Sequence, residues 1–174
     1  MSSENLRATT WWDHYGSAVE AGETHRAELL VRSLSPTPGG HDRRRRVFER
    51  LEEAAGTHVD RYDITIVGEE FCLCESCIDT VPGTRLLEKF TRIREYRDGT
   101  AHSLSFAERT MDSMIIGETY RLLAPPELCL TVYVDGELEG VFPRVIGGET
   151  FGPEEYLEAL TADIAQSRPF AVDV

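Results

Sequence analysis

Apolar and polar positions change their period several times along the chain, and each change predicts a new element. Apolar residues that run together predict a buried strand, strict alternation predicts a half-buried strand, and a spacing of three to four predicts a helix. The elements expected before residue 100 are a strand over 27–34, a helix over 43–55 with Asp42 as its N-cap, a strand over 62–67 and a helix over 84–97. A Ser/Pro/Gly-rich loop over 35–40 separates the first two elements.

The second half of the chain ends in a clear hairpin and helix. Asp135-Gly136 stands between two apolar runs and predicts a tight hairpin turn. The expected elements are a strand over 128–134, its partner over 138–142, and a last helix that begins at Gly152-Pro153. The stretch before them is weaker: 102–106 alternates and predicts a strand, and 111–123 predicts a helix interrupted at Gly117.

The resulting order, β-α-β-α-β-α-β-β-α, indicates a single α/β domain with a mixed sheet flanked by helices. A length of 174 residues with 41% hydrophobic residues suffices for one core. Residues 1–24 are polar apart from Trp11, Trp12 and Tyr15, and we expect an extension followed by the domain over 25–174. An exposed tryptophan pair promotes association, so we expect it to dock on its own domain or on a protein partner.

The charge balance of the chain indicates the ionic conditions and the kinds of partner to expect. The net charge is −13, and Lys89 is the one lysine among 18 cations. Abundant carboxylates with almost no lysine predict a cytoplasm at molar salt, where screening acts within about 3 Å; the alternative is an acidic protein from a GC-rich genome. The excess of negative charge argues against nucleic acid as a partner. No signal peptide and no apolar run of about 20 residues occurs, so we expect a cytoplasmic protein outside the membrane.

Three cysteines within six residues carry the main chemical signal. Cys74 and Cys77 have the C-x-x-C spacing of zinc ligands, and Cys72 adds a third thiolate. A closed zinc site needs a fourth ligand, for which Cys129 and His102 are the candidates. Cys129 also fits a small apolar residue in a strand, and His102 also fits an ordinary loop residue.

The same cysteines allow a redox interpretation. In that case Cys74 would attack a disulfide as the thiolate and Cys77 would resolve the mixed disulfide. The flanking acidic residues disfavour a thiolate and favour a divalent cation, and the next helix is expected to begin only at Thr84, past the cysteines. The sequence therefore predicts an accessory or sensor protein whose cysteines bind zinc or switch redox state. If the chain is an enzyme, we expect a thiol-disulfide oxidoreductase.

The run Arg43–Arg46 opens a third possibility, a DNA-associated regulator. We expect most of this run to form a solvated helix face paired with nearby glutamates. A strand rather than a recognition helix follows the helix over 43–55, so the helix-turn-helix spacing is missing there.

Two matches resemble thioredoxins over residues 26–167. Ala124-Pro125-Pro126 precedes a strand–Asp-Gly–strand hairpin, and Cys74–Cys77 follows the second expected strand. The resemblance implies a thioredoxin-like topology in which Pro126 is a cis-proline that faces Cys74 and Cys77 and shapes a substrate groove. The chain departs from the pattern at Ile78–Gly83, where thioredoxins continue a helix, and it lacks the aromatic residue before the first cysteine.

A second set of motifs resembles a family of small acidic haloarchaeal proteins called "HTH domain" proteins. These motifs are the start Arg26–Pro36, Gly117–Thr119, the hairpin Asp135–Leu138 and the closing stretch Glu149–Leu160. The resemblance implies no activity, and it carries nothing about the cysteines.

Overall fold

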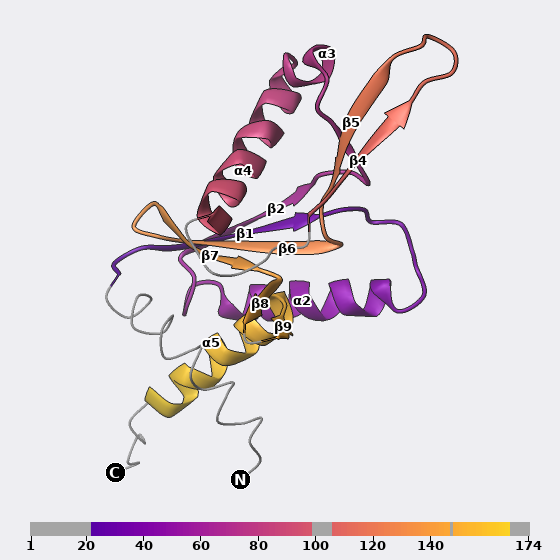
Figure 1. Cartoon of the computed structure of the whole chain (residues 1–174). Coiled ribbons are helices and arrows are strands. Elements are labelled where there is room, and N and C mark those ends of the chain that lie inside the picture. Colours follow the sequence, from indigo (N-terminus) through magenta and orange to yellow (C-terminus); the bar gives the residue numbers. More distant parts are fainter. Residues whose placement is uncertain (1–21, 99–105, 147, 168–174) are drawn as a thin grey trace, which may run out of the picture.

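The computed structural model describes residues 22–98, 106–146 and 148–167 of the chain (Figure 1). The helices are α2 (Gly40–Ala54), α3 (Glu75–Ile78), α4 (Val81–Asp98) and α5 (Pro153–Ser167). The strands are β1 (His25–Val31), β2 (Arg61–Ile66), β3 (Phe71–Cys72), β4 (Ala107–Asp112), β5 (Thr119–Ala124), β6 (Leu128–Val134), β7 (Glu137–Phe142), β8 (Arg144–Ile146) and β9 (Glu149–Phe151). The predicted mixed α/β class is confirmed.

Four strands form the main sheet in the order β2-β1-β6-β7. β1 and β2 are parallel, whereas β6 runs antiparallel to both β1 and β7. Leu29 lies at the centre, opposite Ile64 on one side and Leu130 on the other. A second sheet, β3-β5-β4, is antiparallel, and β8 pairs with β9. In Figure 1, α4 covers one face of the main sheet, while α2 and α5 lie on the other.

Side chains alternate across β1 and β6 and so build two separate cores. The α2/α5 core is formed by Leu29 and Leu130 with residues of α2 and α5, such as Leu51 and Leu157. The α4 core contains Leu30 on the opposite face of β1, together with residues of α4, β3 and β5. α4 is therefore shared between the main sheet and the small β3-β5-β4 sheet.

A carboxylate lies inside the α4 face of the main sheet. The side chain of Glu28 in β1 is 4% exposed and forms an ion pair with Lys89 of α4. Thr65 of β2 donates a second hydrogen bond to the same carboxylate, at 3.1 Å. The chain's one lysine thus neutralises a charge that would otherwise be costly to bury.

The expected helix over 111–123 is wrong, because this stretch forms the β4–β5 hairpin. Gly117 has φ 66, a left-handed conformation that ends a regular helix or strand and suits a turn. The Ser113 N–H then donates to the Glu118 carbonyl at 2.8 Å, which closes the turn. Of the strand expected over 102–106, residues 102–105 lie outside the described residues, and Phe106 precedes β4.

The first strand and the first helix differ from expectation at their ends. β1 stops at Val31, and Leu34 is 57% exposed. α2 begins at Gly40 rather than at Arg43, and its N-cap is Gly39, with no side-chain cap from Asp42. A Cβ at Gly40 would lie 2.2 Å from the Thr37 hydroxyl oxygen and 2.6 Å from a Glu127 carboxylate oxygen, so a larger residue would displace these two side chains.

We predict that Lys89→Met lowers the free energy of unfolding by about 2 kcal/mol, because the buried Glu28 carboxylate loses its counter-ion. The loss is set below that of a fully buried pair because Lys89 is partly exposed. Denaturant unfolding measures it. Arg92→Met, an exposed change on the same helix, is the matched control and should stay within about 0.5 kcal/mol of the wild type. Equal losses for both variants would contradict a stabilising role of the pair.

Candidate metal centre

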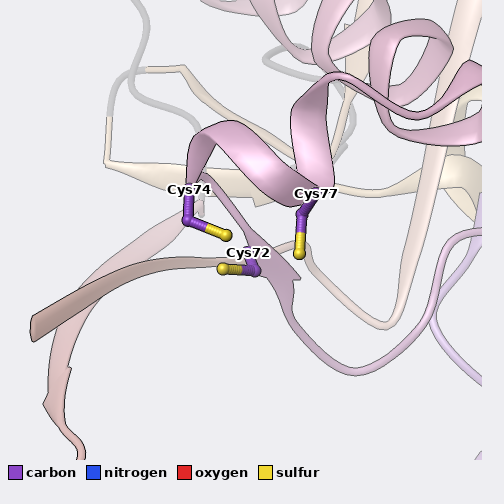
Figure 2. Close-up of side chains that lie close together, drawn as sticks. All are labelled: Cys72, Cys74 and Cys77. Atoms are coloured by element: carbon purple, nitrogen blue, oxygen red, sulfur yellow. The ribbon is translucent and has the colours of Figure 1, made fainter. Parts of the chain in front are cut away.

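Three thiols converge where β3 meets α3. Cys72 is the last residue of β3, Cys74 is the N-cap of α3, and Cys77 lies within α3. Their sulfur atoms all lie within 4.8 Å of one another, and Figure 2 shows the three thiols gathered at the turn of α3. Cys77 is exposed and the other two are partly exposed, so the group is open to solvent.

Local hydrogen bonds produce this convergence. Cys72 is held opposite Leu122 by strand pairing, and the Leu73 N–H donates to the Arg121 carbonyl at 2.9 Å. The chain then turns once: the N–H groups of Cys77 and Ile78 donate to the Cys74 carbonyl at 3.1 and 3.0 Å. This single turn brings Cys77 back over Cys74.

Gly83 fixes the junction between α3 and α4. A Cβ at Gly83 would lie 1.9 Å from the Cys77 carbonyl oxygen, so a larger residue would push α4 off α3. Thr80 adds to the junction, because its hydroxyl donates to the Cys77 carbonyl at 2.7 Å and accepts from the Gly83 N–H at 3.1 Å. Cys77 is therefore positioned from both helices.

The expectation that a helix begins only at Thr84 is wrong. α3 begins at Glu75 and α4 at Val81, so the C-x-x-C stretch does enter a helix, although one of only four residues. The sequence signal was weak because a one-turn helix shows no period. The argument against a thiolate at Cys74 is weakened accordingly, since a helix N-terminus favours negative charge.

The thiols differ in acidity because they bond to one another. Hydrogen bonds from the Cys72 thiol, followed by the Cys77 backbone and thiol, lower the pKa of Cys74 from 9.0. The hydrogen bonds to Cys74 and then to Cys72 raise the pKa of Cys77 to about 11. Cys74 therefore ionises before Cys77, because the hydrogen bonds that lower the pKa of Cys74 raise that of Cys77.

Cys129 is not part of this group among the described residues. It is fully buried in β6, within the α4 core. Burial, followed by the charge of Glu28, raises the pKa of Cys129 to about 12. The other expected fourth ligand, His102, and the pair Trp11-Trp12 lie outside the described residues.

Tyr120 is a neighbour that the sequence reasoning missed. Partial burial and then the Glu118 carboxylate raise its pKa, and the charges of Cys74 and Cys72 add to the effect. Strand pairing explains its position: Leu122 opposes Cys72, and Tyr120 stands two residues away on the same face. The pairing register of β5 with β3 places Tyr120 near the cysteines, and the sequence alone does not give this register.

Pro126 does not match its thioredoxin-based expectation. Among the described residues the cis peptide bond is Phe142–Pro143, and the bond before Pro126 is trans. The preceding carbonyl, that of Pro125, accepts a hydrogen bond at 2.9 Å from the Arg32 guanidinium beyond β1. The fold thus uses this loop to hold the end of β1.

The arginine run is largely engaged within the protein. Arg43 forms an ion pair with Glu154 of α5, and Arg45 lies 3.6 Å from Glu49 one turn on. Arg44 is 4% exposed and donates to the carbonyls of residues 33, 34 and 35 at 2.7–3.2 Å. Arg43 therefore holds α2 against α5, and Arg44 holds it against the β1–α2 loop.

Comparison with known proteins places the chain in a family. The sequence pattern of the family described as "Helix-turn-helix domain" matches residues 19–165, so the chain belongs to that family. The expected kinship with "HTH domain" proteins is thereby confirmed. No curated protein and no solved structure matches the chain.

Two consecutive helices with a short turn are present at the cysteines. α3 and α4 are separated by Asp79 and Thr80 alone. Cys77 lies within α3 and Cys74 is its N-cap, whereas Cys72 ends β3. α2, by contrast, is followed by β2, as the sequence predicts. In the described ranges, no helix has the length and apolar character needed to span a membrane.

We predict that alkylation separates the cysteines by pH. The lowered pKa keeps Cys74 ionised at lower pH than an ordinary thiol, so its modification should begin first as pH rises, whereas Cys77 should lag until pH approaches 11. Mass spectrometry of iodoacetamide-treated protein measures each site. Cys129 should react only after denaturant is added. Faster modification of Cys77 than of Cys74 at neutral pH would contradict the assignment.

We predict that Arg44→Met lowers the free energy of unfolding by about 2 kcal/mol, because it leaves the loop carbonyls without their donor. Arg46→Met, an exposed change in the same turn, is the control and should stay within about 0.5 kcal/mol of the wild type. Thermal or denaturant unfolding decides. A larger loss for Arg46→Met would show that the run acts in another way.

Proposed function

We propose that this protein is a metal-responsive accessory or sensor protein in which Cys72, Cys74 and Cys77 bind a soft divalent cation, zinc. The observation that carries this proposal is the convergence of three sulfur atoms within 4.8 Å. Thiolates are preferred zinc ligands, and three of them satisfy most of a tetrahedral site. All three cysteines are at least partly exposed, so a solvent molecule would be available as the fourth ligand.

The acidity of Cys74 and the surrounding charge support a cation at this place. Each thiol must lose its proton to bind the metal, and one of the three is already acidified. Glu75 follows Cys74 directly, and Glu70 lies near the start of β3. Their carboxylates lower the energy of a divalent cation, although the Arg109 guanidinium offsets that of Glu70.

Metal binding would act on the helix pair. The three ligands join the end of β3 to α3, and the Gly83 junction joins α3 to α4. A bound ion would therefore lock α3 against the end of β3, and the tight Gly83 junction would pass this position on to α4, which gives the α3–α4 pair a metal-dependent state. The proposal includes a protein partner that binds one of the two states, metal-bound or metal-free. The protein would act in a cytoplasm at high salt.

A dithiol switch is the second candidate, favoured by the position of Cys74 at the N-cap of α3 with Cys77 one turn later. In this case the Cys74 and Cys77 thiols form a disulfide and pass two electrons and two protons to a disulfide substrate, which is released as two thiols. The order β2-β1-β6-β7, with helices on both faces, supports a thioredoxin-like topology for this candidate. The trans peptide bond before Pro126 argues against the substrate groove of a thioredoxin-like oxidoreductase. Because Arg44 already binds carbonyls of the β1–α2 loop, the arginine run is a poor candidate for DNA binding.

We predict that protein purified anaerobically without chelator carries about one zinc ion per chain. Cys74→Ser should lose the ion, because two thiolates remain, whereas Cys129→Ala should keep it. Elemental analysis of both variants beside the wild type measures the content, and thermal unfolding shows whether each variant is folded.

Two results would reject the zinc site. Zinc retained in folded Cys74→Ser would place the ion elsewhere. An absence of metal, together with two thiols that oxidise and reduce reversibly in the wild type, would select the dithiol switch.

A further inference from the structure

The turn between β4 and β5 presents three large apolar side chains to solvent. Met114, Ile115 and Ile116 are 98%, 95% and 59% exposed, and the hairpin projects away from the rest of the fold (Figure 1). The turn is ordered by its own hydrogen bonds, including the Gly117 N–H to the Ser113 carbonyl at 2.8 Å. Such a turn needs no apolar residues to form, so the tip marks an interaction surface.

A cavity of about 190 Å³ lies near the other end of the same hairpin. Its apolar wall comes from the β3–α3 junction, α4 and β5, namely Leu73, Ile78, Leu87, Phe90 and Leu123. Thr91, Arg94 and Arg121 complete the lining. The cavity is open to solvent and large enough for a branched apolar side chain.

The lining of this cavity carries excess positive charge in a protein that is otherwise acidic. Arg94 lies 3.9 Å from the Glu108 carboxylate, and Arg121 pairs with the same carboxylate. Two guanidinium groups therefore share one carboxylate. Each of the two arginine side chains is more than half exposed and free to meet a second acidic group.

The charge and apolar surface of the hairpin tip are complementary to those of the cavity. Exposed acidic residues flank its apolar side chains: Asp112 ends β4 and Glu118 precedes β5. An acidic apolar tip thus matches an apolar cavity with arginines in its lining. Leu123 of the cavity lies near the base of the hairpin, opposite Glu108 and at the far end of β5 from the tip, so a tip cannot fill the cavity of its own chain.

We propose that two copies of this protein form a two-fold dimer in which the hairpin tip of each copy fills the cavity of the other. Ile115 enters the apolar part, while Asp112 and Glu118 approach Arg94 and Arg121. The contact is isologous: each copy gives one tip and one cavity, so the assembly closes at two. β4 is the edge strand of its sheet, with all six residues exposed, and it leaves room for the second hairpin alongside.

Charge favours a second copy over a lipid surface as the occupant. The acidic residues beside the tip repel anionic headgroups, and the net charge of −13 opposes approach to such a surface. The same net charge makes two copies repel each other at low salt. Dimerisation should therefore strengthen as salt screens this repulsion.

Sedimentation velocity of the full chain over a concentration series, at low and at molar salt, tests the proposal. The wild type should reach the mass of a dimer. Ile115→Glu should raise the dimer dissociation constant about a hundredfold or more, because two buried isoleucines become charged. Leu34→Glu, at another exposed apolar residue, is the matched control and should leave the dimer unchanged.

Charge reversal tests the cavity separately. Arg94→Glu/Arg121→Glu and Asp112→Arg/Glu118→Arg should each be monomeric alone, and their mixture should form a heterodimer because both of its tip–cavity contacts again join opposite charges. A wild type that stays monomeric at all concentrations and salts overturns the proposal, as does a dimer unaffected by Ile115→Glu. Tip-dependent flotation of a monomeric wild type with phosphatidylglycerol vesicles would instead assign the tip to membranes and also overturn it.

Discussion

The pair of Glu28 and Lys89 is the constraint on which the arrangement of the other parts depends. It joins the central strand of the main sheet to α4, and α4 in turn positions β3, α3 and the β4–β5 hairpin. The buried carboxylate accepts from Lys89 of α4 and from the Thr65 hydroxyl of β2, so the register that keeps Lys89 beside Glu28 is favoured over registers that would leave this charge unpaired.

This register explains how one helix serves two sheets. Phe90 of α4 lies within the α4 core, with its ring 5.7 Å from that of Phe71 in β3 and 5.6 Å from that of Phe106 before β4. A rotation of α4 would break these ring contacts together with the ion pair. The small sheet, and with it the thiol cluster, is therefore oriented by the same contacts that close the main core.

The sequence predicted the elements in which apolar residues recur at a regular spacing over many residues, and it did not predict the shorter elements. β1, α2, β6 and the Asp135-Gly136 hairpin were predicted, with β1 and α2 displaced by up to three residues at their ends, because burial on a regular element leaves a regular pattern. α3 has four residues and β3 has two, too few to show a period. The run around Ile115 and Ile116 read as a buried helix because apolar residues are normally inside, and here they are exposed.

The thiol site, like the fold, could be predicted from the sequence only in part. The spacing of Cys72, Cys74 and Cys77 was sufficient to group them, because residues within one turn can meet whatever the fold is. The place of Cys129 depended on which face of β6 it occupies and on how far β3 lies from that face. Both are tertiary facts, set by the packing of α4, and no local pattern contains them.

The location of the cluster bears on what it can do. It lies in the segment built from β3, α3 and the start of α4, outside the α2/α5 core. None of the residues of α3 is buried, so little apolar burial holds this turn in place. Segments of this kind open at lower free-energy cost than a buried core. A ligand or a disulfide at the cysteines can therefore set the position of α3 while the main sheet stays folded.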